Sequence, residues 1–226
     1  IFERIYFARP DSIIDGQTVY TYRINLGKQL AKESAVDADV IVPIPDSGVP
    51  AAIGYSQQSG TPFELGIIRN HYIGRTFIEP SQSIRQFGVK LKHSVNKSVI
   101  KDKRVILIDD SIVRGTTASK IVNMVYEAGA KEVHLGITCP PIKFPDFYGI
   151  DTPKHKELMA SNYNLDAMTK IVGAKSLFFL SLKGTYVAMG YKNRDNENPQ
   201  FSDHCFTGDY PINVEEIQNS KNELFD

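Results

Sequence analysis

Two adjacent carboxylates followed by a Gly-Thr-Thr turn are the strongest chemical signal in the sequence. Asp109 and Asp110 end an apolar run, and Gly115, Thr116 and Thr117 open a helical pattern shortly afterwards. Neighbouring carboxylates repel each other, so they favour hydroxyl donors or a divalent cation as partners. A glycine lets the backbone approach a phosphate closely, and threonine hydroxyls and the unpaired N–H groups of a helix N-terminus bind its oxygens. The pattern therefore indicates a site for a phosphorylated ribose and Mg²⁺.

The acidic pair alone is ambiguous, because a strand can also end in an Asx turn with a threonine capping the next helix. Residues 105–117 taken together combine a buried strand, two acidic residues, a turn and a glycine before a helix. In an open α/β sheet, ligands bind outside the carboxyl ends of the strands, which is where this turn is expected. The whole segment therefore favours ligand binding over a purely structural turn.

A second turn of similar character follows an earlier apolar run. Asp46, Ser47 and Gly48 come after two prolines and precede an alanine-rich helical pattern. Read alone, this segment is equally consistent with a proline-rich turn in which a serine or aspartate caps the helix. The segment by itself leaves both interpretations open.

The chain between residues 69 and 98 is unusually long for a connection and is strongly basic. Residues 69–104 hold nine Lys and Arg against two acidic residues, a net charge of 9 − 2 = +7. Connections longer than about 15 residues are frequently functional loops. A loop of this kind can close over a reactive glycosyl donor and exclude the water that would hydrolyse it. We therefore predict a lid here.

Buried strands alternating with helices are predicted to position these turns. Short, β-branched apolar runs typical of buried strands occupy residues 40–44, 63–68, 105–108 and 133–137. Helical patterns cover residues 20–35, 49–58 and 117–128. Continuous apolar strands that alternate with helices predict a parallel sheet covered on both faces. Beyond Cys139, short helices at 153–160 and 165–171 and a strand at 177–180 indicate a smaller subdomain over the carboxyl edge of the sheet.

Composition excludes several other classes of protein. The 226 residues hold 26 Lys and Arg and 26 Asp and Glu, so the chain lacks the positive excess expected of a nucleic-acid binder. Two cysteines cannot build a disulfide scaffold, and the apolar runs are too short to span a membrane. No basic segment followed by an apolar stretch opens the sequence, so no secretory signal is predicted and the cytoplasm is the expected location.

Residues 105–117 resemble the phosphoribosylpyrophosphate (PRPP) motif of type I phosphoribosyltransferases. With residues 5–12, 43–48, 69–82, 147–151 and 206–211, almost the whole chain resembles the glutamine PRPP amidotransferase family. The resemblance implies an α/β, type I phosphoribosyltransferase fold, with a mainly parallel sheet flanked by helices and a small C-terminal hood. It implies an interdomain linker at 1–17, a core at 18–139 and a hood and tail at 140–226. The N-terminal glutaminase domain of that family is not in this chain.

The resemblance also implies roles for individual residues. Residues that bind substrate are expected in the two turns and just before the lid: Asp46, Ser47, Gly48, Arg69, Asp109, Asp110, Ser111, Arg114, Gly115, Thr116 and Thr117. Residues of the loop that closes over PRPP and acts in catalysis are Tyr72, Arg75, Phe77, Ile78 and Lys92. Mg²⁺ is expected at Ser47, Asp109 and Asp110. Arg69 stands where the family often has a lysine.

Some members of the family carry an iron–sulfur cluster on four cysteines. The matching positions in this chain are Asp146, Ser202 and Cys205, and the fourth falls just before Ile1. Two of these three residues are not thiols, so we expect no iron–sulfur cluster. Cys139 is interpreted as a small apolar residue at the end of a strand.

The implied reaction is the displacement of pyrophosphate from PRPP by ammonia, which gives 5-phosphoribosylamine in the first step of purine biosynthesis. Expected partners are PRPP, ammonia, purine nucleotide inhibitors, a glutaminase domain or chain and further copies of this chain. Neither nucleic acid nor membrane is expected. Two alternatives remain: a PRPP-binding regulator that keeps the fold without the chemistry, and a phosphoribosyltransferase for another acceptor. Turnover of PRPP separates them.

Overall fold

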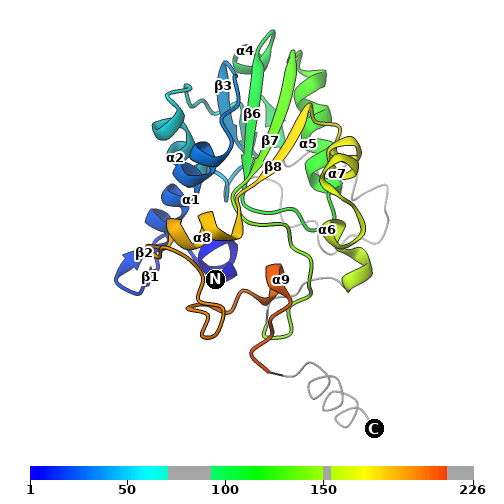
Figure 1. The fold of residues 1–226 in the computed structure, drawn as a ribbon. Helices are drawn as coiled ribbons and strands as arrows, with labels where there is room; N and C mark the ends of the chain where they lie inside the picture. The colour runs from blue at the N-terminus through cyan, green and yellow to red at the C-terminus, as the bar shows by residue number, and fades with distance from the viewer. Residues whose placement is uncertain (71–92, 150–153, 213–226) are drawn as a thin grey trace.

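The centre of the fold is a four-stranded parallel sheet (Figure 1). The computed structural model describes residues 1–70, 93–149 and 154–212. In spatial order the sheet contains β3 (Val40–Pro43), β6 (Arg104–Asp109), β7 (Glu132–Ile137) and β8 (Ser176–Phe179). Each strand is parallel to its neighbours, which confirms the predicted sheet.

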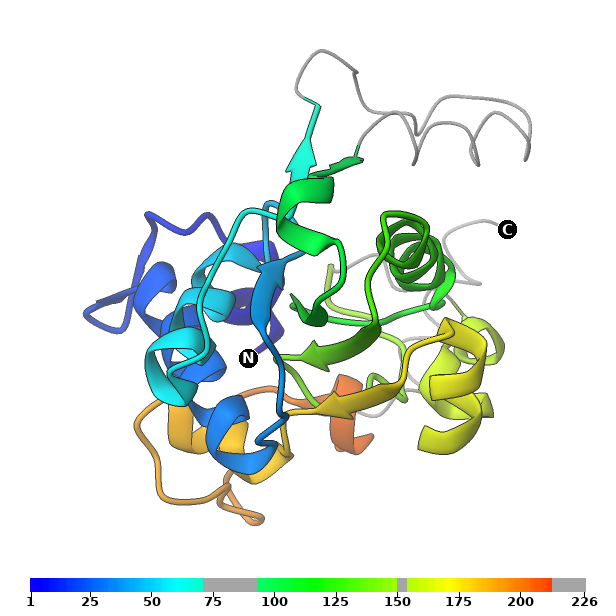
Figure 2. The same ribbon diagram turned by 90° about the horizontal axis from the view of Figure 1, so that it is seen from above.

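Helices cover both faces of this sheet (Figure 2). On one side lie α1 (Val19–Glu33) and α2 (Val49–Ser59), and on the other lie α5 (Thr116–Glu127) and α7 (Leu165–Val172). The apolar sides of the helices are buried, as the sequence pattern predicts for Leu26 and Leu30 of α1 and for Ile121, Val122 and Val125 of α5. A two-layer cover of this kind explains why the strands between them are apolar on both faces.

Shorter elements complete the described chain. They are η1 (Glu3–Phe7), β1 (Ile13–Ile14), β2 (Gln17–Thr18), β4 (Ile67–Arg69), β5 (His93–Val95), α4 (Lys97–Ile100), η3 (His155–Glu157), α6 (Met159–Asn162), α8 (Leu182–Ala188) and α9 (His204–Thr207). The strands β1 and β2 form an antiparallel hairpin ahead of α1. Helix α8 packs against α1, so the chain after β8 returns to the first face of the sheet.

The predicted buried strand at residues 63–68 is wrong in most of its length. Phe63 makes a single parallel bridge to Ile41 at the edge of the sheet. The Gly66 N–H then donates to the Glu64 carbonyl at 2.9 Å, a tight bend that turns the chain away from β3. Only the end of the run is a strand, β4, and it pairs antiparallel with β5 outside the main sheet. The run is therefore not buried throughout, and Leu65 is 53% exposed.

Three further differences lie beyond residue 139. The predicted strand at 177–180 exists as β8, but it is the fourth strand of the central sheet, so the sheet extends past the expected core boundary. The predicted helix at 153–160 is divided into η3 and α6, and residue 153 lies outside the described residues. Helix α8 was not predicted, because Gly184 interrupts its short apolar pattern.

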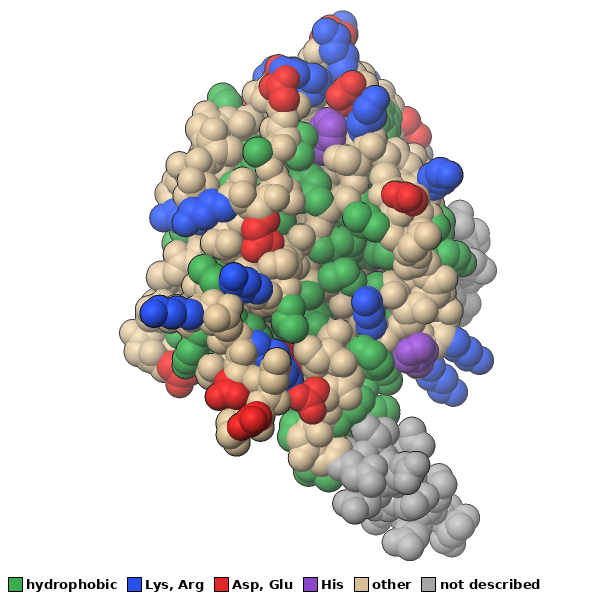
Figure 3. Space-filling view, in the orientation of Figure 1, with side chains coloured by type: hydrophobic (Ala, Val, Ile, Leu, Met, Phe, Trp, Pro, Cys, Tyr) green, Lys and Arg blue, Asp and Glu red, His purple; other side chains and the backbone are tan. Residues whose placement is uncertain are grey.

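The surface carries both signs of charge. Figure 3 shows basic and acidic side chains scattered over one face of the molecule, with apolar side chains between them. Among the described helices, none has the length and apolar composition needed to cross a membrane. The mixture of basic and acidic side chains on the surface agrees with their equal numbers in the sequence.

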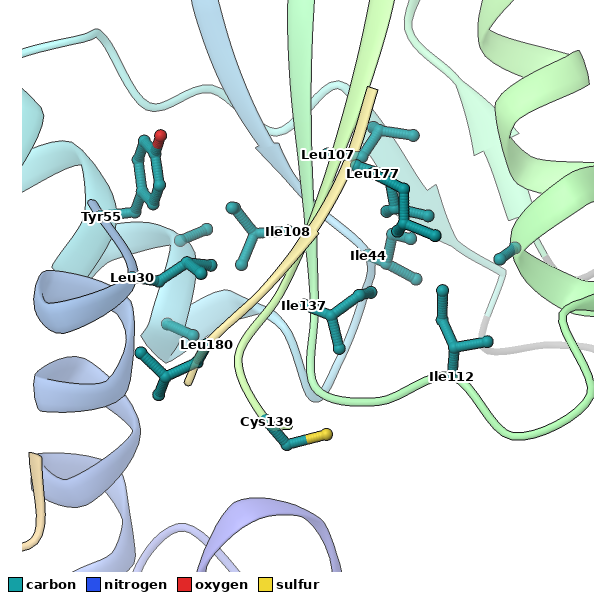
Figure 4. Close-up of a cluster of buried hydrophobic side chains, with 14 of the residues drawn as sticks. Leu30, Ile44, Tyr55, Leu107, Ile108, Ile112, Ile137, Cys139, Leu177 and Leu180 are labelled. Atoms are coloured by element: carbon teal, nitrogen blue, oxygen red, sulfur yellow. The ribbon is translucent and has the colours of Figure 1, made fainter. Parts of the chain in front are cut away.

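One hydrophobic core joins the sheet to the helices on both faces (Figure 4). Leu30 of α1 and Tyr55 of α2 reach Ile108 of β6 on one face, while Leu107 and Ile112 lie toward the other. The residues of β6 from Val105 to Ile108 are completely buried. This burial fixes the position of the polar residues that follow at the end of the strand.

Gly48 brings α2 directly against the carboxyl end of β6. A Cβ atom at this position would lie 2.3 Å from the Ile108 carbonyl oxygen and 2.8 Å from the Ile44 carbonyl oxygen. The Ile108 oxygen cannot retreat freely, because it accepts a hydrogen bond from the Ile44 N–H at 2.9 Å. Only glycine therefore fits at this contact.

Replacing Gly48 with alanine should lower the free energy of unfolding by about 3 kcal/mol, because the helix must move away from the strand. Gly60→Ala is the matched control, since Gly60 has φ +79° and a methyl group added there would meet no atom within 4 Å. It should cost about 1 kcal/mol, from backbone strain alone. Urea unfolding measures both values, and equal losses would show that the contact with β6 is not tight.

A buried ion pair between Arg194 and Asp203 stabilises the C-terminal part of the chain. The Arg194 Nε donates to Asp203 Oδ2 at 2.7 Å, and the Tyr186 hydroxyl donates to the same oxygen at 2.7 Å. The side chains of Arg194 and Asp203 are 11% and 1% exposed. Burial alone would raise the pKa of Asp203, but the hydrogen bonds from Arg194 and Tyr186 outweigh it and hold that pKa below its ordinary value.

Arg194→Gln should lower the free energy of unfolding by about 3 kcal/mol at pH 7, because it leaves a buried carboxylate without its cation. The native pKa of Asp203 is depressed, so the stabilisation is complete above the unfolded value of about 3.9 and is lost as the pH falls through the native value. The difference between parent and variant should therefore shrink below about pH 4, as urea unfolding at several pH values can measure. A loss that is the same at every pH would contradict an ionic origin. Arg9→Gln, at an exposed pair, is the control.

Candidate active site

The acidic pair lies at the carboxyl edge of the sheet, where the sequence places it. Asp109 is the last residue of β6 and pairs in register with Ile137 of β7. The Asp110 N–H donates to Asp109 Oδ1 at 2.9 Å, and the Ser111 hydroxyl donates to Asp110 Oδ1. Asp110 is 5% exposed. Two carboxylates are therefore held side by side, with Asp110 buried and Asp109 half-buried.

Burial and mutual repulsion make this pair costly to ionise. Burial is the larger cause that raises the pKa of Asp109, and the charge of Asp110 raises it further. Burial also raises the pKa of Asp110, although the hydroxyls of Ser111 and Ser47 and the charge of Arg23 oppose the rise. A ligand that brings positive charge or hydroxyl donors to this edge would relieve the repulsion.

The turn after the pair has the backbone that a phosphate site needs. Gly115 adopts φ +78° and immediately precedes α5, so the free N–H groups at the start of this helix lie beside it. A Cβ on Gly115 would lie 2.5 Å from Met159 Sδ, and the Met159 N–H donates to the Val113 carbonyl at 2.8 Å. The turn is therefore supported by residues that follow the central sheet strands β6 and β7.

Arg114 is already oriented by a carboxylate from that same supporting segment. Its Nε and Nη2 atoms donate to Glu157 Oε2 at 3.0 and 2.9 Å. Both side chains remain about half exposed, at 54% and 41%. The guanidinium is thus held at the mouth of the turn and remains accessible to an anionic ligand.

The turn after β3 meets the turn after β6. Ser47 lines the same cavity as Asp110 and lowers the pKa of that carboxyl, and Gly48 packs on Ile108. Asp46 forms an ion pair with Arg69 of β4, which joins this turn to the strand that leads toward residue 71. The structure therefore brings together residues that lie far apart in the sequence.

A cavity of about 500 Å³ opens over these turns. The predicted residues that line it are Ser47, Asp109, Asp110, Ser111, Arg114, Gly115, Thr116 and Thr117. Asp46, Gly48 and Arg69 support its rim or its wall and do not line it. The volume suits a ligand of nucleotide size, and the polar groups converge from two strand ends.

The predicted lid residues Tyr72, Arg75, Phe77, Ile78 and Lys92 lie outside the described residues. The two ends of that segment are described, and they are adjacent. Arg69 of β4 pairs in register with His93 of β5, and His93 lines the cavity. The described residues that flank this segment therefore lie together, and His93 lies at the candidate site.

The residues near the site that were not predicted from the sequence include Phe2, Tyr6 and Arg23. Phe2 and Tyr6, from the N-terminal segment, form one wall of the cavity. Arg23 of α1 is 4% exposed and donates to the carbonyls of Arg4, Tyr6 and Ala8 at 3.2, 3.0 and 2.7 Å. A charged residue among the apolar positions of a predicted helix was the available signal for Arg23. Nothing in the sequence pattern alone places the aromatic wall.

The donor set at the acidic pair fits a magnesium ion that is bound together with a substrate. The described residues contain no cluster of three or more His, Cys, Asp or Glu side chains that could hold a metal ion alone. Asp109, Asp110 and Ser47 supply only oxygen donors. Mg²⁺ typically takes one or two carboxylates and completes its shell with water and substrate phosphates.

Comparison with known proteins gives consistent relatives. The chain is 63% identical to the amidophosphoribosyltransferase of Rhizobium etli over 95% of its own length and 43% of that protein. It is 50% identical to the chloroplastic amidophosphoribosyltransferase of Glycine max over 96% of its length and 37% of that protein. The chain thus spans less than half the length of these relatives.

A solved structure with the same fold supports this relation. The glutamine PRPP amidotransferase of Bacillus subtilis, complexed with ADP and GMP, matches with a TM-score of 0.85 and 52% identity over 94% of this chain and 47% of that chain. The phosphoribosyl transferase domain family matches residues 23–165, which include both turns of the cavity. The chain therefore belongs to the phosphoribosyltransferase family and is homologous to the amidophosphoribosyltransferases along almost its whole length.

Proposed function

We propose that the chain transfers the phosphoribosyl group of PRPP to ammonia, releasing pyrophosphate and forming 5-phosphoribosylamine. The observation that carries this proposal is the shared cavity, which is lined by the carboxylate pair and by the Gly-Thr-Thr turn at the start of α5. The pair suits the ribose diol, and the turn suits the 5-phosphate. The relation to amidophosphoribosyltransferases supports ammonia as the acceptor.

Binding and orientation account for most of the proposed chemistry. Gly115, Thr116 and Thr117 hold the 5-phosphate, with Ser111 and Arg114 beside them, while Asp109 and Asp110 accept from the ribose hydroxyls. The bound sugar then presents C1 to ammonia, and fixed orientation lowers the barrier. The C1–O bond to pyrophosphate breaks as the C1–N bond forms, through an oxocarbenium-like state. Asp109, Asp110 and Ser47 would hold Mg²⁺, which would neutralise charge on the leaving pyrophosphate.

The loop of Asp46, Ser47 and Gly48 is proposed to bind the pyrophosphate. Ser47 of this loop lines the same cavity as the Gly-Thr-Thr turn, so one PRPP molecule would contact both. Arg69, paired with Asp46, adds positive charge at this rim. The residues Tyr72, Arg75, Phe77, Ile78 and Lys92 are proposed to close over the donor and exclude water.

Neither cysteine suits the hydrolysis of glutamine. A glutaminase thiol must be accessible and readily ionised. Cys139 is buried, and burial raises its pKa well above the ordinary value. Burial also raises the pKa of Cys205 to about 12. Nitrogen from glutamine therefore requires a glutaminase domain or chain in addition to the residues described.

Further partners follow from the relatives. Purine nucleotides are proposed as inhibitors, because the B. subtilis relative was solved with ADP and GMP. We also propose assembly with further copies of the chain and a cytoplasmic location. The division into a linker at 1–17, a core at 18–139 and a hood and tail at 140–226 remains a prediction.

Asp110→Asn should weaken Mg²⁺-dependent PRPP binding by about 10- to 150-fold, the loss expected for a charge-assisted bond to a buried ligand. Calorimetric titration with PRPP and Mg²⁺ measures the affinity. Asp11→Asn is the matched control, since this aspartate is 68% exposed and pairs with Arg9. Unchanged affinity in Asp110→Asn would show that the carboxylate pair does not bind PRPP.

The purified chain should release pyrophosphate from PRPP with ammonium chloride but not with glutamine. Unprotonated ammonia is the nucleophile, so the rate should rise with pH until the protein loses stability. A coupled pyrophosphate assay with each nitrogen source measures this, and Asp110→Asn, with its weaker PRPP binding, serves as the low-activity control. Turnover with glutamine would contradict the assignment of the nitrogen source. Binding without turnover would favour the regulator, and turnover only with a purine base or orotate would favour another acceptor.

A further inference from the structure

The positions that correspond to cluster cysteines in some relatives hold a hydrogen-bonded network in this chain. His204 Nε2 lies 2.7 Å from Asp146 Oδ2, and His204 Nδ1 lies 2.8 Å from the Ser202 hydroxyl. An iron–sulfur cluster takes four thiolate ligands. Asp146 and Ser202 are not thiols, and their polar atoms are engaged with His204. The residues present therefore do not fit a cluster.

The network is buried, and the polar side-chain atoms of Asp146, Ser202 and His204 are engaged in hydrogen bonds, which leaves Cys205 as the one thiol among the three matching positions in this chain. The side chains of His204 and Asp146 are 5% and 6% exposed. Both ring nitrogens of His204 have partners, and Asp146 Oδ1 accepts from the Tyr148 N–H at 2.7 Å. The His204 ring stacks on Tyr210 with 5.0 Å between ring centroids, and Tyr148 packs edge-on at 5.0 Å. Each polar atom is thus satisfied within the protein, as burial requires.

Three segments that are distant in sequence meet at this network. The Cys205 carbonyl accepts from the N–H groups of Lys143 and Phe144 at 2.9 and 3.1 Å. The amino group of Ile1 donates to the Ser202 carbonyl at 2.9 Å. The chain around residues 143–148, the chain around α9 and the N-terminal segment are therefore joined at one point.

This junction also touches the candidate active site. Phe2 packs against Phe206 with an edge-on geometry and 6.3 Å between ring centroids. Phe2 also lines the cavity over the carboxylate pair. The position of one cavity wall thus depends on the segment that α9 holds.

We propose that Asp146, His204 and Ser202 form a metal-free network of hydrogen bonds at the position where some members of the family hold an iron–sulfur cluster. It binds the segment 143–148 to α9 and, through Ser202 and Phe206, holds the N-terminal segment against the cavity. The proposal concerns the stability and local order of this region and does not depend on which acceptor the enzyme uses.

A double-mutant cycle tests the central bond. His204→Ala and Asp146→Ala should each raise the equilibrium constant for unfolding about tenfold or more, and the double variant should be little worse than either single variant. The coupling between them should therefore be about tenfold. The matched control is the exposed pair of Arg9 and Asp11, where the coupling should stay below about fivefold. Additive losses at His204 and Asp146 would overturn the proposal.

Hydrogen exchange measured by mass spectrometry locates the effect. Asp146→Asn and Ser202→Ala are milder changes that keep the fold. They should speed exchange in peptides that cover residues 139–149 and 201–212, while peptides from β6 and β7 stay protected. Unchanged exchange in the first two peptides would overturn the proposal.

Metal content provides an independent test. The parent protein, incubated anaerobically with ferrous iron and sulfide and then desalted, should retain no stoichiometric iron and show no iron–sulfur absorbance. Retained iron that slows hydrogen exchange in residues 139–149 and 201–212 would show that a metal, and not the hydrogen-bonded network, joins these two segments.

Discussion

The carboxylate pair at the end of β6 is the constraint on which the candidate site depends. Two carboxylates that repel each other when ionised are held at the end of an apolar strand, where burial raises the pKa of both. Such a pair is expensive unless hydroxyls, cations or a ligand compensate it. The surrounding polar groups, Ser47, Ser111 and Arg23, provide part of this compensation. A substrate with hydroxyl groups, bound together with Mg²⁺, would provide the rest.

Close packing around this pair explains why the two turns share one cavity. Gly48 allows α2 to start against the Ile108 carbonyl, and Gly115 allows the second turn to lie on Met159. Both helices then begin at the same edge of the sheet, and the turns that precede them contribute Ser47 and Gly115 to the same cavity. The parallel direction of the strands makes this arrangement possible, because it collects all carboxyl ends on one side.

The remaining chain closes the site from outside the sheet. Arg23 holds the carbonyls of the N-terminal segment, and the network around His204 joins that segment to α9. Glu157 orients Arg114 from the segment that follows β7. The parts of the chain expected to be a linker and a hood therefore contribute directly to the cavity wall and to the orientation of a binding residue.

The local sequence pattern was sufficient to predict those elements whose structure depends on residues close together in the sequence. The apolar runs of β3, β6 and β7, the amphipathic α5 and the motif from Asp109 to Thr117 could be predicted, because strand burial, helix periodicity and turn chemistry are encoded within a few residues. The pattern failed at residues 63–68, where a tight bend at Gly66, and not hydrophobicity, removes the chain from the sheet.

Only the tertiary structure decided which distant residues meet. Phe2 and Tyr6 reach the cavity because buried Arg23 fixes the backbone between them and residue 8, and no local pattern records that contact. His204 contacts Asp146, which lies more than fifty residues earlier in the sequence. In the sequence alone, each of the two is an ordinary polar position. β8 joins the central sheet by pairing in parallel with the edge of β7. Such contacts depend on the packing of the whole chain, whereas the phosphate turn depends on its own residues.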